Sequence, residues 1–348
     1  MPRMRYVIAL LACCLIPLVA LPQAAPKSGL TKLLEGELSR FPAKTGIYVK
    51  HMTTGEEAAV REHELFNSAS VIKLPVLVMA FQMVDTKKLD LTQRVEFKKS
   101  DYRGGSGVLR SFSVGLSPTY LDLLTQMVIT SDNSATDVMI AKVGGVDRVN
   151  QWLKENGYSE LRLNHTTYEL FRRPYELVDP KYKNLTPEDV FALQMRLPAF
   201  TEGRTALIEE VRQAQAAHPG ANNFIQRMET DQDFWLGAMS PRDTGRLLEG
   251  INKATLTSKT SSDEMQRIMR GQLSGARRLP HFINVGVGHK TGDYPPSVAN
   301  DVGIIYTRSG PVVVASFNQN ITGNYAEAED RIGVIGRLIV DYFDGAGR

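Results

Sequence analysis

Cysteine is almost absent from this chain of 348 residues, which contains only Cys13 and Cys14. Both lie in residues 1–25, where two arginines precede the apolar run 7–21 and small residues follow it, a pattern typical of a secretory signal. Cleavage near Ala24 leaves a mature chain without cysteine, which excludes disulfides, a cysteine nucleophile and thiolate metal sites. We therefore expect an exported protein, periplasmic or extracellular, with an uncleaved N-terminal anchor as the alternative.

Further apolar runs and a strong excess of charge are also missing. No other stretch approaches 18 apolar residues, so we expect no stable membrane span after signal cleavage. Lysine and arginine exceed aspartate and glutamate by only 41 − 38 = 3, which gives no electrostatic reason to expect nucleic acid as a partner. The six histidines form no close-spaced ligand set, and no G-x-S-x-G string occurs, so zinc hydrolases and nucleophile-elbow hydrolases are disfavoured.

The patterns that are present place strands at both ends of the chain and helices in the middle. Strands are predicted at 45–52, 58–60, 282–290, 302–306 and 312–318. An amphipathic helix at 326–343 follows the last of them. This order predicts an α+β fold in which an antiparallel sheet collects the N- and C-terminal strands and packs with a mostly helical part. No linker divides residues 26–348, so we expect a single catalytic domain.

Several helix starts can be predicted from local chemistry. Residues 70–84 are apolar on nearly every face, which is typical of a helix in the middle of a core. Ser117-Pro118 predicts a helix with proline at its first position. At Thr186 and at Ser240 a hydroxyl is followed directly by proline, and an acid stands three residues after the hydroxyl, which predicts two further helix starts.

Ser70-Val71-Ile72-Lys73 is the first of three short motifs that can carry chemistry. On a helix, positions i and i+3 share a face, so the Ser70 hydroxyl and the Lys73 amine can meet. Serine is a weak nucleophile until a base takes its proton, and desolvation at a buried helix start favours the neutral, basic form of lysine. The alternative is a helix cap followed by a surface lysine. The apolar neighbours of Lys73 disfavour that alternative because an unpaired buried charge is costly.

Two further tripeptides complete the set. Ser131-Asp132-Asn133 supplies a hydroxyl for proton relay and an amide that both donates and accepts, with an Asx turn between helices as the alternative. Lys290-Thr291-Gly292 presents a cation and a hydroxyl to an anionic group, and its glycine allows a close backbone approach. The same tripeptide at 44–46 is interpreted as an ordinary strand entry, because only the later copy follows the other two motifs.

In this order the three motifs resemble those of the class A serine β-lactamases and the related penicillin-recognising serine hydrolases. The resemblance extends to Gly104–Leu109, to the helix end at Gly144-Gly145 and to Asn300-Asp301-Val302, and it spans most of residues 40–345. It implies the β-lactamase/transpeptidase-like fold. It also implies a hydrolase that opens β-lactam rings through a Ser70 acyl-enzyme, with neither a metal nor an organic cofactor.

The resemblance gives each motif residue a role. Ser70 attacks the lactam carbonyl, and Lys73 accepts or relays its proton. Ser131 passes a proton to the leaving nitrogen. The oxyanion hole consists of the backbone N–H groups of Ser70 and Asp293. Lys290 and Thr291 bind the carboxylate of the substrate, and Asn133 binds its side-chain amide. Gly292 lets the substrate lie close to the backbone of the strand.

The match fails at the residue that releases the acyl group. Class A enzymes carry this glutamate in an omega loop of pattern R-x-E-x-x-L-N, which does not occur here. Spacing from Asn133 places it near Thr167, which cannot act as a general base at neutral pH. Glu169 is the first substitute and Glu176 the second, and the alternative is that both are solvated surface carboxylates. The interval 160–239 is longer than such a loop, which predicts a helical insertion beside the site.

Three functions stay open at this point. The first is a secreted serine β-lactamase with a rearranged deacylating base, and hence an antibiotic-resistance enzyme. The second is a cell-wall D,D-peptidase or an esterase on the same scaffold, and the third is a non-hydrolysing sensor that stays acylated. The missing glutamate favours the last two, and the motif order favours the first. The expected partner is a small-molecule β-lactam or a peptidoglycan peptide, and we expect a monomer.

Overall fold

The computed structural model describes residues 29–219 and 224–345. The predicted signal at 1–25 lies outside the described residues. Five strands form an antiparallel sheet in the order β2-β1-β8-β7-β6, which confirms that N- and C-terminal strands share one sheet. The strands are β1 (Lys44–His51), β2 (Glu57–Val60), β6 (Val287–Tyr294), β7 (Val298–Thr307) and β8 (Gly310–Gln319).

One of these strands begins later than the sequence predicts. Residue Val287 is the first of β6 to lie opposite β7, where it faces Ile305. The last bond of the ladder joins Tyr306 N to Gly286 O at 2.9 Å, and β7 ends one residue later. The predicted strand at 282–290 is therefore wrong in its first half, because those residues lie beyond the end of their partner strand.

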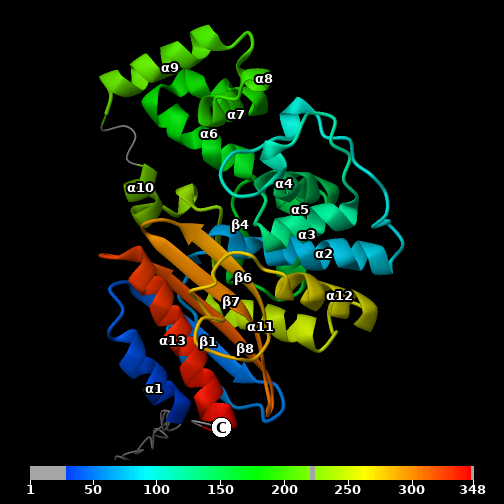
Figure 1. The fold of residues 1–348 in the computed structure, drawn as a ribbon, viewed down its shortest axis with the longest axis vertical. Helices are drawn as coiled ribbons and strands as arrows, with labels where there is room; N and C mark the ends of the chain where they lie inside the picture. Colours follow the sequence, from blue (N-terminus) through cyan, green and yellow to red (C-terminus); the bar gives the residue numbers. More distant parts are fainter. Residues whose placement is uncertain (1–28, 220–223, 346–348) are drawn as a thin grey trace, which may run out of the picture.

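Helices cover both faces of the sheet. Helices α1 (Gly29–Leu38) and α13 (Tyr325–Asp344) lie side by side along one face (Figure 1). Alternation along β8 separates the two cores, since Val312 and Val314 join the cluster beneath these helices and Val313 joins the larger cluster on the other face. The sheet is thus buried on both sides.

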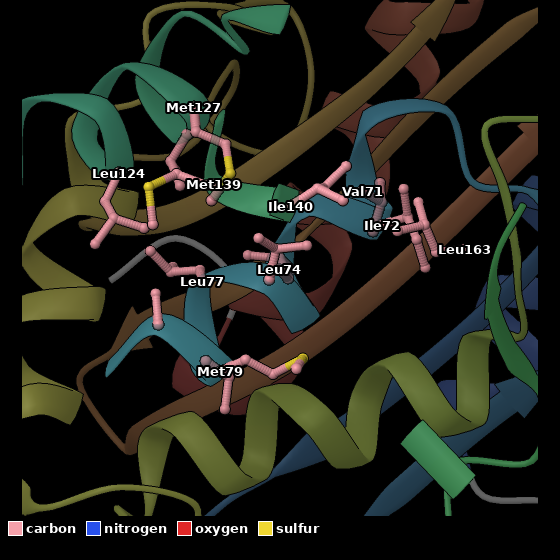
Figure 2. Packing of buried hydrophobic residues seen from close by; sticks show 14 of the residues in the cluster. Val71, Ile72, Leu74, Leu77, Met79, Leu124, Met127, Met139, Ile140 and Leu163 are labelled. Carbon is pink, nitrogen blue, oxygen red and sulfur yellow. The ribbon is translucent and has the colours of Figure 1, made fainter. Parts of the chain in front are cut away.

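The larger core surrounds α2 (Lys73–Asp85), whose residues Leu74 and Leu77 are fully buried. Figure 2 shows these side chains together with Met127 and Met139 from two neighbouring helices. This confirms the central place predicted from the apolar sequence of the helix. The helices around it are α3 (Tyr120–Ile129), α4 (Asn133–Lys142), α5 (Gly145–Glu155), α11 (Pro241–Asn252) and α12 (Lys259–Arg270).

Local cap chemistry sets most of the helix starts. Ser240 accepts a hydrogen bond from Asp243 N, and α11 begins directly after it, as predicted. The start predicted at Ser117-Pro118 is wrong. Helix α3 begins two residues later because Thr119 and Asp122 each accept the backbone N–H of the other, which satisfies both donors.

The chain forms a group of helices between β4 (Leu161–Leu163) and β5 (Gly237–Met239), and Figure 1 shows most of it at one end of the molecule. Strands β4 and β5 pair with each other, so the chain returns to the place from which it left. The helices fall in the interval where an insertion is predicted, and the domain boundaries themselves stay a prediction. The helices are α6 (Thr167–Val178), α7 (Pro187–Met195, capped by Thr186 as predicted), α8 (Pro198–Thr201), α9 (Thr205–Ala217) and α10 (Phe224–Thr230).

Gly292 of β6 lies against the turn before α2, where a methyl group has no room. A Cβ at this position would lie 2.5 Å from Ser68 O and 3.1 Å from Val71 Cγ2. We predict that Gly292→Ala lowers the free energy of unfolding by about 1–3 kcal/mol, measured by urea denaturation.

Gly36→Ala in α1 is the matched control, because nothing lies within 4 Å of its Cβ position. Alanine favours a helix over glycine by up to about 1 kcal/mol, so this variant is expected to be unchanged or more stable. Equal losses of stability in the two variants would contradict the close approach of β6 to the turn.

Candidate active site

Ser70 lies in a short 3-10 turn, Ala69–Ile72, that leads into α2. Ala69 has a φ of 43°, a conformation that is costly for a residue with a side chain. Asn67 holds this turn, because its Oδ1 accepts from Ala69 N at 3.0 Å and its N donates to Gln319 Oε1 of β8 at 2.8 Å. The hydrogen bonds to the sheet thus fix a strained turn next to the predicted nucleophile.

Lys73 is completely buried at the first position of α2. Its Nζ donates to Ser131 O at 2.7 Å, to Ser131 Oγ at 3.1 Å and to Asn133 Oδ1 at 2.9 Å. Burial, and then the charge of Lys290, lower the pKa of Lys73 well below its usual value. This supports the predicted basic amine. Among the described residues, however, the amine bonds to the second motif and not directly to the Ser70 hydroxyl.

Ser131 lies between two amines. Lys290 Nζ donates to Ser131 Oγ at 3.0 Å and to Thr291 O at 2.8 Å, while Lys73 Nζ reaches the same hydroxyl from the other side. Burial lowers the pKa of Lys290 to about 7. The structure therefore brings the three motifs together around one hydroxyl, and a proton can pass from either amine through Ser131.

The turn that contains Ser131 is held by its neighbours. Asp132 accepts from Ala135 N at 2.9 Å, which caps α4, and from Leu109 N at 2.8 Å. Asn133 Nδ2 donates to Gly104 O at 3.0 Å. The segment 104–109 therefore forms a wall of the site, in agreement with its place in the resemblance.

Thr291 contacts two residues that the sequence did not reveal. Its Oγ1 lies 2.7 Å from Ser274 Oγ and 3.0 Å from the side-chain amide of Gln272. Both residues precede β6 in an irregular segment without a motif, so no pattern in the sequence marks them. Together the three side chains form a polar patch at the strand that is predicted to hold the substrate carboxylate.

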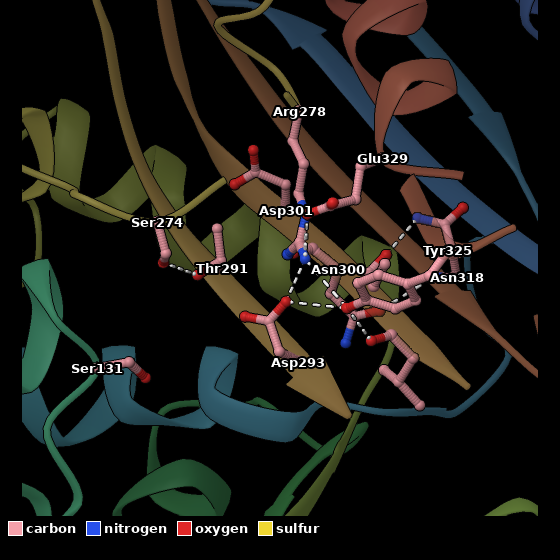
Figure 3. A network of polar contacts seen from close by, with 12 residues as sticks. Ser131, Ser274, Arg278, Thr291, Asp293, Asn300, Asp301, Asn318, Tyr325 and Glu329 are labelled. Atoms are coloured by element: carbon pink, nitrogen blue, oxygen red, sulfur yellow. Dashed lines mark hydrogen bonds and ion pairs between the residues drawn. The ribbon is translucent and has the colours of Figure 1, made fainter. Parts of the chain in front are cut away.

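Asp293 is fixed by a second group that the sequence did not reveal (Figure 3). Arg278, only 2% exposed, donates to Asp293 Oδ1, to Asn300 O at 2.8 Å and to Glu329 Oε1 at 3.1 Å. Burial opposes the charge of Arg278, but Asp293 and its other neighbours raise the pKa of the guanidinium. Tyr325 OH also donates to Asp293 Oδ1, at 3.1 Å. The residue that follows Gly292 is thus tied to α13.

A cavity of about 190 Å³ opens beside Ser70. Thr167, Leu170 and Phe171 of helix α6 line it. Asp137 holds the start of that helix, because it accepts from Thr167 N at 2.7 Å and from Tyr168 N at 2.9 Å. Thr167, near which the spacing from Asn133 places the missing glutamate, therefore lines the same cavity as Ser70. The lining residues are Ser70, Gly105, Ser106, Asn133, Thr167, Leu170, Phe171, Leu236, Asp293 and Tyr294.

Neither substitute carboxylate lies with these residues. Glu169 Oε2 accepts from Thr166 N at 2.8 Å and from Thr166 Oγ1 at 3.0 Å, which caps α6. Two residues of a helix turn by about 200°, so Glu169 points away when Thr167 faces the cavity. Glu176 pairs with Arg172 at 2.9 Å. The structure does not bring either residue together with Ser70, and a role as base stays a prediction from the sequence.

Two properties of the described residues complete the picture. None of the helices in 29–219 and 224–345 is long and apolar enough to cross a membrane. The same residues contain no group of three or more histidine, cysteine, aspartate or glutamate side chains that could hold a metal ion.

Comparison with known proteins agrees with this geometry. The model of a family described as the beta-lactamase enzyme family matches residues 27–343. β-Lactamase BRO-1 of Moraxella catarrhalis is 31% identical over 128 residues, which cover 36% of this chain and only 41% of that protein. β-Lactamase VEB-1 of Pseudomonas aeruginosa is 22% identical over 303 residues, which cover 84% of this chain and 82% of the relative.

The fold is also found among solved structures. A β-lactamase from Chitinophaga pinensis superposes with a TM-score of 0.68 at 21% identity, covering 90% of this chain and 99% of that one. This likeness confirms the predicted α+β, β-lactamase/transpeptidase-like fold. Since the family model covers nearly the whole chain, the protein belongs to the beta-lactamase enzyme family and is a serine β-lactamase-like hydrolase.

Proposed function

We propose that Ser70 opens β-lactam rings and forms an acyl-enzyme with them. The observation that most supports this proposal is the pair of hydrogen bonds by which Lys73 Nζ and Lys290 Nζ both reach Ser131 Oγ, beside the cavity that Ser70 lines. Neutral Lys73 takes the Ser70 proton as Oγ bonds to the lactam carbonyl carbon. The carbon–nitrogen bond then breaks, and Ser131 gives a proton to the leaving nitrogen.

The other motif residues hold the substrate in this proposal. Protonated Lys290 and the Thr291 hydroxyl bind its carboxylate, and the Asn133 amide binds its side-chain amide. The backbone N–H groups of Ser70 and Asp293 stabilise the oxyanion, and Gly292 keeps β6 close enough to Ser70 for this. The proposal includes export to the periplasm or the cell exterior, action as a monomer and no cofactor.

One observation favours a second candidate, an acyl-enzyme that persists. Thr167, near which a deacylating glutamate is expected, lines the cavity together with Phe171, and the Glu169 carboxylate caps α6. Neither a threonine nor a phenylalanine can activate water at neutral pH. A persistent acyl-enzyme is the property of a slow D,D-peptidase or esterase, or of a sensor of β-lactams or peptidoglycan.

We predict that Ser70→Ala abolishes both ring opening and the covalent adduct, because the variant lacks the nucleophile. The measurement combines a chromogenic cephalosporin with an intact mass of the protein. Ser39→Ala, at an exposed serine after α1, is the control and is expected to behave as wild type. A full-size adduct in Ser70→Ala would contradict the assignment of the nucleophile.

The pKa of Lys290, about 7, predicts the alkaline limb of the pH profile. Below pH 7 this amine carries its proton and attracts a substrate carboxylate. Above pH 7 it loses the proton, and with the charge it loses the attraction for the carboxylate. We predict that kcat/KM for an anionic β-lactam falls above pH 7 with an apparent pKa of about 7. In Lys290→Arg the guanidinium stays charged, so the limb moves to higher pH. An unmoved limb in a variant that melts like wild type would show that another group causes it.

A carboxylate placed at Thr167 is expected to release the acyl group. We predict that Thr167→Glu shortens the lifetime of the adduct at least about tenfold, since general base catalysis contributes about 10²–10⁴. Thr167→Gln has the same shape without the base and is the control. The adduct lifetime of Glu169→Gln is measured in the same way, by following the intact mass of the protein over time. A lifetime that becomes about tenfold longer assigns Glu169 as the base, and an unchanged lifetime removes that assignment.

A further inference from the structure

Ser274 places a second hydroxyl beside Thr291, on the strand that is proposed to hold the carboxylate of the substrate. Ser274 Oγ lies 2.7 Å from Thr291 Oγ1, and Figure 3 shows the two side chains joined by this hydrogen bond. A hydroxyl has one proton to donate and can accept as well, so the bond between the two side chains uses one of their two protons. The Thr291 hydroxyl therefore cannot bind a substrate independently of Ser274.

The backbone after Ser274 fixes this pair of hydroxyls. Gly275 has a φ of 77°, and a Cβ at this position would lie 2.5 Å from Thr291 Cγ2. The chain thus passes directly against the methyl group of Thr291, which only glycine allows. Because the methyl group is held there, the Thr291 side chain cannot rotate freely about its Cα–Cβ bond, and its hydroxyl stays beside Ser274.

The side-chain amide of Gln272 accepts the proton that remains. Gln272 Nε2 donates to Ile129 O at 2.9 Å, and Oε1 accepts from Thr291 N at 3.1 Å. The reversed amide would place its oxygen against the carbonyl oxygens of Ile129 and Val128, so this orientation is the one that satisfies both ends. Oε1 also lies 3.0 Å from Thr291 Oγ1 and 3.2 Å from Ser274 Oγ, and it can only accept. One hydroxyl proton thus joins Ser274 to Thr291, and the other is donated to Gln272.

A carboxylate at Thr291 is able to take a proton from this arrangement. The Thr291 proton turns from the neutral amide oxygen to the charged acceptor, because charge-assisted hydrogen bonds are about twice as strong. Gln272 Oε1 keeps the N–H of Thr291 and is not left without a donor. Among the described residues, Ser274 is the hydroxyl in contact with Thr291 Oγ1, so it is the group that can donate to this oxygen. Hydrogen bonds in such a chain strengthen one another.

We propose that Ser274 is a positioning residue for the substrate carboxylate, since it donates to Thr291 Oγ1 and so directs the Thr291 proton to that carboxylate. This proposal rests on the proposed acylation of Ser70 and on the binding of the carboxylate by Lys290 and Thr291, and it adds a further residue to that binding site. Lys290 supplies the charge, while the two hydroxyls supply a directed bond. A free carboxylate gains more from this bond than a neutral ester does.

The test compares benzylpenicillin with its methyl ester, which has the same ring and acyl side chain but no carboxylate. The second-order rate constant for acylation of Ser70 is measured at pH 7 with the protein in excess, from the loss of the intact β-lactam. In Ser274→Ala we expect the rate constant for the carboxylate to fall about 3- to 10-fold, and that for the ester to fall less than about twofold. Ser274→Thr keeps the hydroxyl and is expected to react within about twofold of wild type.

A double-mutant cycle shows whether Ser274 acts through Thr291. Thr291→Val removes the hydroxyl that Ser274 is proposed to direct. In this background Ser274→Ala is expected to change the rate constant for the carboxylate less than about twofold, because no hydroxyl remains for Ser274 to direct. Ser39→Ala, at an exposed serine after α1, is the control and is expected to react with both compounds as wild type does. Melting temperatures of all variants are measured alongside.

Each result decides between distinct conclusions. Equal losses for carboxylate and ester in Ser274→Ala would overturn the proposal, because they show a structural role only. An unchanged rate constant for the carboxylate, a Ser274→Thr variant as slow as Ser274→Ala, or the same loss in the Thr291→Val background would overturn it too. If neither compound acylates Ser70 in wild type, or if Thr291→Val reacts with the carboxylate as wild type does, the proposed function fails instead, and this inference with it.

Discussion

The burial of two lysine amines around one serine hydroxyl is the constraint on which the site depends. Lys73 and Lys290 come from α2 and β6, and both bond to Ser131 Oγ. Burial removes the hydration of both amines and lowers the pKa of each, and the charge of Lys290 lowers the pKa of Lys73 further. In the proposed function the lowered pKa of Lys73 makes its amine the base, and shifted pKa values of this kind are typical of catalytic sites.

The rest of the fold keeps these groups in contact. The sheet brings β6 beside the first turn of α2, and Gly292 allows the approach because it has no side chain. Asn300 of β7 donates to Asn67 O at 2.8 Å, which ties the strained turn before Ser70 to the sheet. Hydrogen bonds from β7 and β8 therefore hold this turn, and the strained backbone of Ala69 persists because these contacts fix it.

The sequence predicted the features that local chemistry determines, such as motifs and strands. It missed those that depend on contacts between residues far apart in the chain, such as where a strand ends and which arginine is buried. The three motifs were found because each places a particular reactive group at a short spacing, and the strands at both chain ends predicted the sheet. The strand at 282–290 was predicted too long because its partner, β7, ends at Thr307, which no local pattern reveals. Arg278 was missed for a similar reason, since its neighbour Arg277 is exposed and only the fold shows which one is buried.

The region near Thr167 differs from the pattern that the resemblance implies. Thr167 lines the cavity beside Ser70 at the position where the spacing from Asn133 predicts a glutamate. The contacts among Lys73, Ser131 and Lys290 are present. The site thus holds the three motifs together but has a threonine at the position where the pattern has a water-activating carboxylate.

The account depends most directly on the protonation of the two buried amines. The decisive measurement is an NMR titration of the lysine side chains, with Lys73 and Lys290 assigned from Lys73→Arg and Lys290→Arg. The account predicts that Lys290 titrates near pH 7 and that Lys73 titrates well below the usual value of 10.5. Titration of both amines above pH 10, together with the exposed lysines, would contradict it.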